Sequence, residues 1–421
     1  MTNSFSPLVQ DTTKAQNESI RTIVGKLDDK EVYIPDYQRD SEQWDYRKQS
    51  LFIESLLNNL TIPAFFFCEG EDLNDEVVDG QQRLSTIWKF YKNDLTMSAN
   101  DKVSYIAPQS ILYSGKKFKD LDKKLQRIFL SYPLTIIYLP KDLKLETKLE
   151  IFRRINEGGT PLSGQDIRLA YYSESKSVTL IRLVGIHKNT TTLNDEDSED
   201  DEDHKKPFQR MVEIAEKKGL SNPWDNFTNA RERWYEWWKG QKISKGQAPS
   251  LMFLWYLVCL DRKKLKYLLD NENQTHLKIR FGGSTENALD IYCAQLKHQD
   301  LNQNEISLVS SFHTIQNHYF REFATWIEMI LTRKLPGISV NKYKQLALFI
   351  AGAVELDISP TELSDEQWNV TGNFIRSSRK VGKELLDGDN YPEPKGLWSG
   401  KSGQFKQCDA TVEIVRNIFK K

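Results

Sequence analysis

The chain has 421 residues, a length that allows two to three domains, each with a buried core. Lysine and arginine total 58 and aspartate and glutamate total 59, so the formal net charge of -1 excludes an overall field that would attract nucleic acid or a membrane. Any contact with DNA therefore needs a local basic face. Four scattered cysteines exclude a disulfide framework or a closely spaced zinc site, and we expect buried free thiols at Cys68, Cys259, Cys293 and Cys408.

The sequence carries neither a secretory signal at its N-terminus nor a stretch that could span a bilayer. The N-terminal residues lack a basic stretch followed by an apolar run, as a secretory signal would have. No run approaches the roughly 18 apolar residues that cross a bilayer. We therefore expect a soluble, cytoplasmic protein without a membrane partner.

The first third of the sequence mixes strand and helix patterns. Residues 31–34 and 63–68 have the composition and length of strands, and residues 52–60 repeat apolar side chains at helical spacing. Residues 76–78 form another strand, which leads into a polar turn. The apolar stripe over residues 84–91 then predicts a helix, so the turn joins a strand to an amphipathic helix.

The α+β pattern continues to about residue 172. Residues 134–139 are predicted to form a strand, and residues 145–155 a helix that ends at a Gly-Gly pair. A capping-box-like sequence at residues 163–166 begins another helix. Beyond residue 172 strand patterns fade and aromatic-rich helical stretches dominate.

These changes predict an α+β protein with an N-terminal domain over residues 1–172 and a mainly helical domain over residues 206–421. Between them, residues 195–203 contain eight acids in nine residues. Such a composition cannot fold alone and repels itself, so we expect residues 173–205 to be a flexible acidic connection.

The turn Asp79-Gly80-Gln81-Gln82-Arg83 has a structural and a functional interpretation. As structure, Asp79 would be the helix N-cap and Gln82 would complete a capping box, with Gly80 easing the backbone into the helix. As a site, the positive end of the helix would bind a phosphate, with Arg83 adding a charge-assisted contact. A cap needs only one carboxylate and one amide, so the additional Gln81, expected to be partly enclosed, favours the functional interpretation.

Two further segments carry unexplained polar residues. The sequence Ile34-Pro35-Asp36-Tyr37-Gln38-Arg39 places a second Gln-Arg pair after a strand, and two such pairs could converge on one phosphate-rich ligand. In residues 152–163, a helix end and a new cap explain the glycines and the proline. They do not explain Asn156 and the neighbouring arginines.

Together, these three segments resemble the DGQQR family of prokaryotic domains of unknown function, over about residues 20–172. The family includes the GmrS half of GmrSD modification-dependent restriction proteins and the N-terminal domain of the anti-phage protein SspE. The resemblance implies a ParB/sulfiredoxin-like fold, nucleotide binding or hydrolysis at the turn, and a role in defence against foreign or modified DNA. It also implies DNA and a separate nuclease subunit as partners.

Carried over position by position, the resemblance implies catalytic roles for Asp79, Gln82 and Arg83, with an NTPase linked to restriction as the expected enzyme. It implies nucleotide or phosphate contacts for Gly80, Gln81, Gln38, Arg39 and Asn156. A nucleoside triphosphate and a divalent metal such as Mg²⁺ are implied in the same way, with Asp79 orienting the metal or an attacking water. The sequence itself contains no Gly-x-x-x-x-Gly-Lys-Ser/Thr loop.

Two other functions remain open from the sequence. In a ParB-like DNA adaptor, Arg39 and Arg83 would hold DNA phosphates without nucleotide turnover. In a nuclease, His204 would be the candidate general base, although the surrounding sequence lacks a clear nuclease motif. Basic residues 262–266 and 376–380 are expected to be solvated faces or DNA contacts, and Trp234, Trp237 and Trp238 core residues or a pocket for a modified base.

Overall fold

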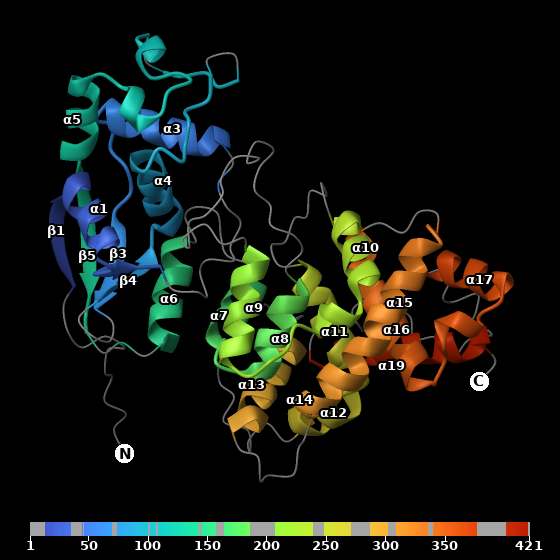
Figure 1. Cartoon of the computed structure of the whole chain (residues 1–421). Coiled ribbons are helices and arrows are strands. Elements are labelled where there is room, and N and C mark those ends of the chain that lie inside the picture. The colour runs from blue at the N-terminus through green and yellow to red at the C-terminus, as the bar shows by residue number, and fades with distance from the viewer. Residues whose placement is uncertain are drawn as a thin grey trace, which may run out of the picture. The chain divides into compact units, whose positions relative to one another are not determined.

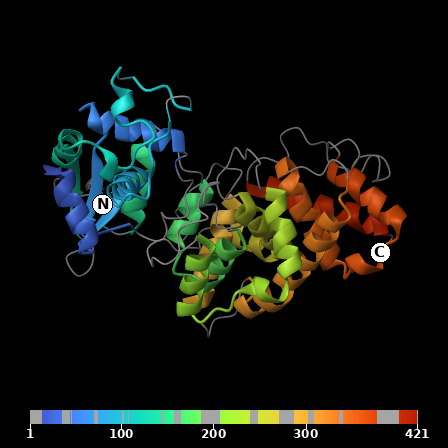
Figure 2. The ribbon, with the colours of Figure 1, turned by 45° about the horizontal axis from the view of Figure 1, so that its top comes forward.

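The structure is a computed structural model, and it describes residues 13–34, 44, 46–69, 74–99, 102–106, 108–141, 143, 145–156, 164–185, 207–238, 248–270, 287–301, 309–335, 340–376 and 401–419. The chain divides into two compact units, Met1–Pro161 and Leu162–Lys421. The strands lie in the first unit, and the described part of the second unit is helical (Figures 1 and 2). The predicted order of an α+β part followed by a helical part is confirmed.

The N-terminal unit contains a mixed five-stranded sheet and its covering helices. The strands are β1 (Lys14–Ser19), β2 (Val32–Tyr33), β3 (Phe65–Glu69), β4 (Asp75–Asp79) and β5 (Pro133–Leu139). The α-helices are α1 (Ile20–Asp28), α3 (Tyr46–Leu57), α4 (Gln81–Tyr91), α5 (Lys123–Ser131) and α6 (Leu145–Asn156), with 3-10 turns η2 (Ser110–Leu112) and η3 (Phe118–Asp120).

The order of strands across the sheet is β1-β5-β3-β4-β2. The neighbours β3 and β4 are antiparallel, as are β1 and β5, whereas β2 runs parallel to β4 and β3 runs parallel to β5. Parallel strands end at the same edge of a sheet. The chain therefore leaves β2 and β4 at one common edge.

A shared apolar core joins one face of the sheet to helices α1, α3, α4 and α5. Its members are fully or almost fully buried, among them Ile20, Ile23, Ile53, Leu56, Phe65, Phe67, Leu84, Ile87, Phe90, Phe129 and Ile136. Phe90 packs edge-on against Phe129, with ring centroids 5.3 Å apart. These apolar side chains recur every three or four residues in the helices, which explains why the helical spacing was visible in the sequence.

The C-terminal unit is built from helices throughout its described residues. These are α7 (Gly164–Tyr171), α8 (Lys176–Gly185), α9 (Pro207–Lys217), η5 (Pro223–Asn226), α10 (Thr228–Trp238), α11 (Ala248–Leu260), α12 (Arg262–Asp270), α13 (Asn287–Leu301), α14 (Phe312–Thr314), the π-helix η7 (Ile315–Tyr319), α15 (Phe320–Thr332), η8 (Val340–Lys342), α16 (Tyr343–Glu355), η9 (Pro360–Glu362), α17 (Asp365–Arg376) and α19 (Lys401–Phe419). Helix α11 is buried around nearly its whole circumference and forms the centre of this unit.

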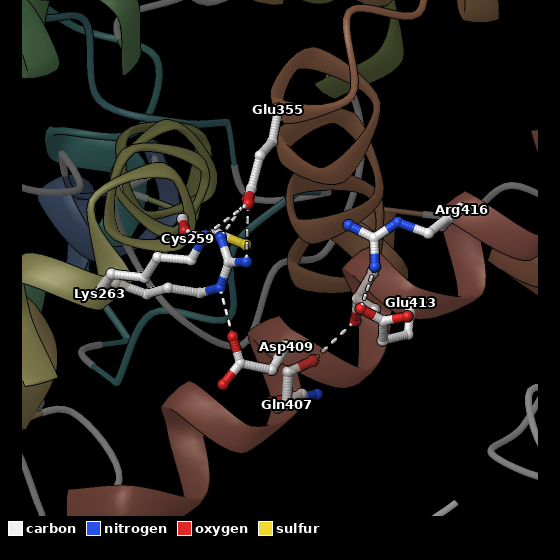
Figure 3. Close-up of polar contacts among 9 residues, drawn as sticks. Cys259, Lys263, Glu355, Gln407, Asp409, Glu413 and Arg416 are labelled. Atoms are coloured by element: carbon white, nitrogen blue, oxygen red, sulfur yellow. Dashed lines mark hydrogen bonds and ion pairs between the residues drawn. The ribbon is translucent and has the colours of Figure 1, made fainter. Parts of the chain in front are cut away.

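A buried arginine, Arg262, ties three helices of this unit together, and Figure 3 labels its partners Glu355 and Asp409. Arg262, at the start of α12, donates from Nε to Asp409 of α19 over 2.6 Å and from NH2 to Glu355 of α16 over 3.1 Å. Its NH1 also bonds to Glu355 and to the carbonyl of Cys259. Arg262 is only 4% exposed, so this member of the basic run 262–266 is a structural ion-pair residue.

Several smaller expectations have clear outcomes. All four cysteines are free and buried, as predicted. Trp234 and Trp238 are core residues with ring centroids 5.5 Å apart, which confirms the packing interpretation for these two. No helix among the described residues is long and apolar enough to cross a membrane. Residues 195–203, His204 and residues 377–380 lie outside the described part of the chain.

Candidate functional site

The polar turn lies where β4 passes into α4, as the sequence predicted. Gly80 occupies the N-cap position with a φ of 101°, in the left-handed region that favours glycine. A Cβ atom at this position would overlap the ring of Phe65. The turn thus requires glycine for its backbone conformation and also for space.

The capping box expected from Asp79 and Gln82 is wrong. The N-terminus of α4 has no hydrogen bond from a capping side chain. Asp79 instead accepts a hydrogen bond from NH2 of Arg83 over 2.8 Å, in an ion pair whose side chains are 14% and 10% exposed. The register of β3 and β4 shifts beside Phe66 and Phe67, directly before the turn, and such bulges re-aim the following side chain.

Arg83 is held by the protein through several groups. Its NH1 donates to the carbonyl oxygen of Pro63, and NH2 donates to that of Ala64 over 3.1 Å. Its guanidinium carbon lies 4.6 Å from the ring centroid of Phe65. Burial lowers the pKa of Arg83, and the charge of Asp79 opposes that shift. The side chain therefore fastens the start of α4 to the chain that leads into β3.

Gln82 connects the turn to a distant segment. Its Oε1 accepts a hydrogen bond from the backbone N–H of Trp44 over 3.1 Å. Because the carbonyl oxygen is used in this way, Nε2 remains as the donor end of the amide, and the described residues supply no partner for it. Gln81 is 8% exposed, which confirms that it is enclosed.

The segment between residues 34 and 44 follows β2 and ends beside this turn. Strand β2 pairs with the first two residues of the parallel strand β4, and Trp44 bonds to Gln82. Gln38 and Arg39 belong to this segment but lie outside the described residues. Their predicted contact with the ligand is therefore still a prediction, and Trp44, which follows them, lies at the turn.

The third segment follows α6, which lies beside β4 (Figure 1). Strand β5 ends at Leu139, beside Cys68 and thus near the beginning of β4. Lys148, in the first half of α6, donates to Glu76 of β4 over 2.6 Å. Helix α6 continues for eight residues beyond Lys148 and ends at Asn156.

This arrangement fits an anion better than a bare metal ion. The N-cap residue of α4 is Gly80, which has no side chain, and the nearby Asp79 and Arg83 charges balance each other. Among the described residues, no group of three His, Cys, Asp or Glu side chains could hold a metal ion.

Some parts of the site were not foreseen from the sequence. The carbonyl groups of Pro63 and Ala64 and the ring of Phe65 come from β3 and its approach, with no motif to mark them. The spacing of four residues between Asp79 and Arg83 did carry a signal, because oppositely charged side chains at this spacing commonly pair near a helix.

Comparison with known proteins gives one match. Residues 20–173 match the family described as GmrSD restriction endonuclease, N-terminal domain. The match contains the turn, the segment before Trp44 and helix α6. No curated protein and no solved structure matches the chain.

Proposed function

Because residues 20–173 belong to the family of GmrSD restriction endonuclease N-terminal domains, we propose that this protein takes part in the restriction of foreign or modified DNA and binds a nucleoside triphosphate at the turn. The observation that carries the nucleotide site is the hydrogen bond from Trp44 to Gln82. It joins Trp44, which follows the motif segment of residues 34–39, to the turn at the start of α4.

The phosphates would lie on the backbone N–H groups of the first turn of α4. The first turn of a helix presents N–H groups without intrahelical partners, and its dipole favours an anion. Gly80 lets the backbone approach a ligand closely, since it has no side chain. Gln82 would donate from Nε2 to a phosphate oxygen, because its Oε1 is already used by Trp44.

In this proposal Arg83 and Asp79 position the turn. Arg83 keeps the turn against Pro63 and Ala64, and Asp79 balances its buried charge. A divalent metal such as Mg²⁺ would be held mainly by the phosphates, with Asp79 as the nearest carboxylate, and would neutralise phosphate charge when bound. Gln38, Arg39 and Asn156 would complete the site from the neighbouring segments.

Hydrolysis of the nucleotide is the second part of the proposal. Phosphoryl transfer depends mostly on positioning and charge neutralisation. The Asp79 carboxylate lies at the start of α4, where it could accept a proton from a water directed at the terminal phosphate. Its ion pair with Arg83 would hold the carboxylate in place at the start of the helix.

The nucleotide site is tested by equilibrium binding of ATP and GTP to the full chain, with Mg²⁺ and with EDTA. Gln82→Glu retains an acceptor for Trp44 but replaces the free donor with a second acceptor. We expect it to weaken binding about tenfold or more, since a hydrogen bond to a charged group contributes about 1.5–3 kcal/mol. The matched control is Gln16→Glu, an exposed glutamine on β1.

Equal affinities of the wild-type protein and Gln82→Glu would overturn this site. Phosphate release measured on the same proteins separates binding from turnover. Nucleotide binding without phosphate release would indicate a nucleotide sensor. If Asp79→Asn still binds the nucleotide but no longer releases phosphate, the proposed hydrolysis is supported.

A further inference from the structure

Six cations occur within residues 116–127 of the N-terminal unit, a stretch here termed the α5 surface. They are Lys116, Lys117, Lys119, Lys123, Lys124 and Arg127. The same stretch contains two acids, Asp120 and Asp122, so its net charge is 6 − 2 = +4, in a chain whose net charge is -1. The α5 surface is therefore a local basic region in a chain that has almost no net charge.

Helix α5 presents its cations on one side. Successive residues of a helix turn by about 100°, so Lys123, Lys124 and Arg127 lie within an arc of about 100°. All three are exposed. Phe129 on the opposite side is fully buried in the core. The core thus fixes which side of α5 faces solvent.

The turn before α5 is fastened to the helix by one glutamine. Nε2 of Gln126 donates to the backbone carbonyls of Phe118, Lys119 and Leu121 over 3.3, 3.3 and 3.0 Å. Phe118 itself packs against Phe90 of the core, with ring centroids 6.0 Å apart. Lys119 is consequently held beside the exposed side of α5, and the α5 surface is organised before any ligand arrives.

The two acids do not neutralise these cations. Asp122 caps α5 by accepting a hydrogen bond from the backbone N–H of Leu125 over 2.8 Å. Asp120 accepts one from the backbone N–H of Lys117 over 3.3 Å. Within the described part of the chain, Lys123, Lys124 and Arg127 make no ion pair.

Two of these lysines lie at a position where a positive charge destabilises the helix. Lys123 and Lys124 occupy the first turn of α5, which contains no acidic residue. The helix dipole disfavours cations there. The Asp122 carboxylate at the N-cap offsets part of this cost, and a polyanionic ligand bound beside the lysines would offset more of it.

We propose that the α5 surface binds the phosphate backbone of duplex DNA, independently of sequence. The choice of DNA as the partner rests on the proposed function in restriction. A membrane is the weaker candidate because helices that lie on bilayers insert large apolar side chains. None is exposed within the α5 surface itself, and the exposed Ile111 and Leu112 lie before it, in the turn η2.

The test is duplex binding by the full chain over a series of salt concentrations. In the triple variant Lys123→Gln, Lys124→Gln, Arg127→Gln, we expect the slope of log K against log[salt] to become shallower by about 2–3, because each lost phosphate contact removes about 0.9. Affinity should fall at least tenfold at low salt. The control neutralises three exposed cations of the C-terminal unit: Lys176→Gln, Lys217→Gln, Arg233→Gln.

Each possible result of these binding measurements either supports or overturns DNA binding by the α5 surface. An unchanged slope in the triple variant, with wild-type binding intact, would overturn the α5 surface and leave the proposed function standing. An equal loss in the control would show a general charge effect and also overturn it. Absence of duplex binding by the wild-type protein, or binding only to vesicles containing phosphatidylserine, would overturn both the α5 surface and the DNA part of the proposed function, whereas the nucleotide site is tested separately through Gln82.

Discussion

At the scale of single residues, Gly80 combines two requirements that can be separated by experiment. Gly80→Ala must accept a φ of 101° and a clash with Phe65, whereas Gly115→Ala must accept only a φ of 69°, because nothing lies within 4 Å of its Cβ position. We expect a loss of about 1 kcal/mol for Gly115→Ala and about 2–4 kcal/mol for Gly80→Ala. Hydrogen exchange of peptides from the N-terminal unit measures both. Equal losses would show that Phe65 moves aside without cost.

Arg83 provides a second prediction at this scale. Arg83→Lys keeps the charge beside Asp79 but cannot reach Pro63 and Ala64 with separate donors. We expect the N-terminal unit to lose about 2 kcal/mol of stability, together with nucleotide affinity. The control is Arg21→Lys, an exposed arginine on α1. A variant that lost nucleotide binding at full stability would make Arg83 a direct ligand of the phosphates.

Residue roles were harder to predict than residue positions. The enclosure of Gln81 followed from its place near the apolar side of α4, and it is confirmed. The capping box failed because Asp79 had a competing partner four residues away, and a buried arginine requires its counter-ion. The bond between Gln82 and Trp44 joins residues 38 positions apart, and no local pattern encodes it.

At the scale of elements, the sequence predicted most strands of the N-terminal unit and some of its helices. Strands β2 to β5 and helices α4, α6 and α7 lie within a few residues of the stretches that apolar periodicity and breakers indicated, and α3 begins six residues before its predicted stretch. Helices α1 and α5 were not predicted. Strand β1 was missed because its side chains are exposed or half-buried, which leaves no apolar alternation. It is an edge strand, paired on one side with β5.

The contact of α12 with α16 and α19 predicts a pH dependence. Burial alone would raise the pKa of Glu355, but the hydrogen bond and charge of Arg262 outweigh it, and the pKa lies below the ordinary 4.5. A lowered pKa in the folded state stabilises the protein above the ordinary value, and this contribution is lost as pH falls through the folded value. We expect thermal stability to fall more steeply from roughly pH 5 to pH 3 in the wild type than in Glu355→Gln.

Glu355→Gln should also destabilise the C-terminal unit at neutral pH by about 2–4 kcal/mol, because Arg262 stays buried with one carboxylate fewer. Glu413→Gln on α19 is the control, since Glu413 is half-exposed and pairs with Arg416 alongside it. Parallel pH curves for the wild type and Glu355→Gln would contradict the assignment.

At the scale of the whole molecule, α7 bears on where a stable N-terminal fragment ends. The family match extends to residue 173, but the compact N-terminal unit ends at Pro161. Arg168 of α7 is completely buried and donates to Asp290 of α13 over 2.7 Å, and Gln165 donates to Ser250 of α11 over 3.1 Å. Helix α7 therefore packs with the C-terminal unit, and the boundary predicted at residue 172 stays a prediction.

Two fragments test this assignment. We expect residues 1–161 to be monomeric and to unfold cooperatively. Residues 1–173 should self-associate, because Ile167, Leu169 and Tyr171 of α7 would lose the helices that bury them. Size-exclusion chromatography with light scattering measures the difference. Two equally monomeric fragments would show that α7 is stable without the C-terminal unit.

The bond between Trp44 and Gln82 also gives the nucleotide site an optical signal of its own. Only Trp44 and Trp88, of ten tryptophans, precede the boundary at Pro161. Trp44 is half-buried and packs edge-on against Phe52, with ring centroids 5.4 Å apart. A ligand that binds Gln82 should shift the fluorescence emission of Trp44. The wild-type protein would then show this shift during a titration without any label, whereas a Trp44→Phe variant would bind the ligand without the shift.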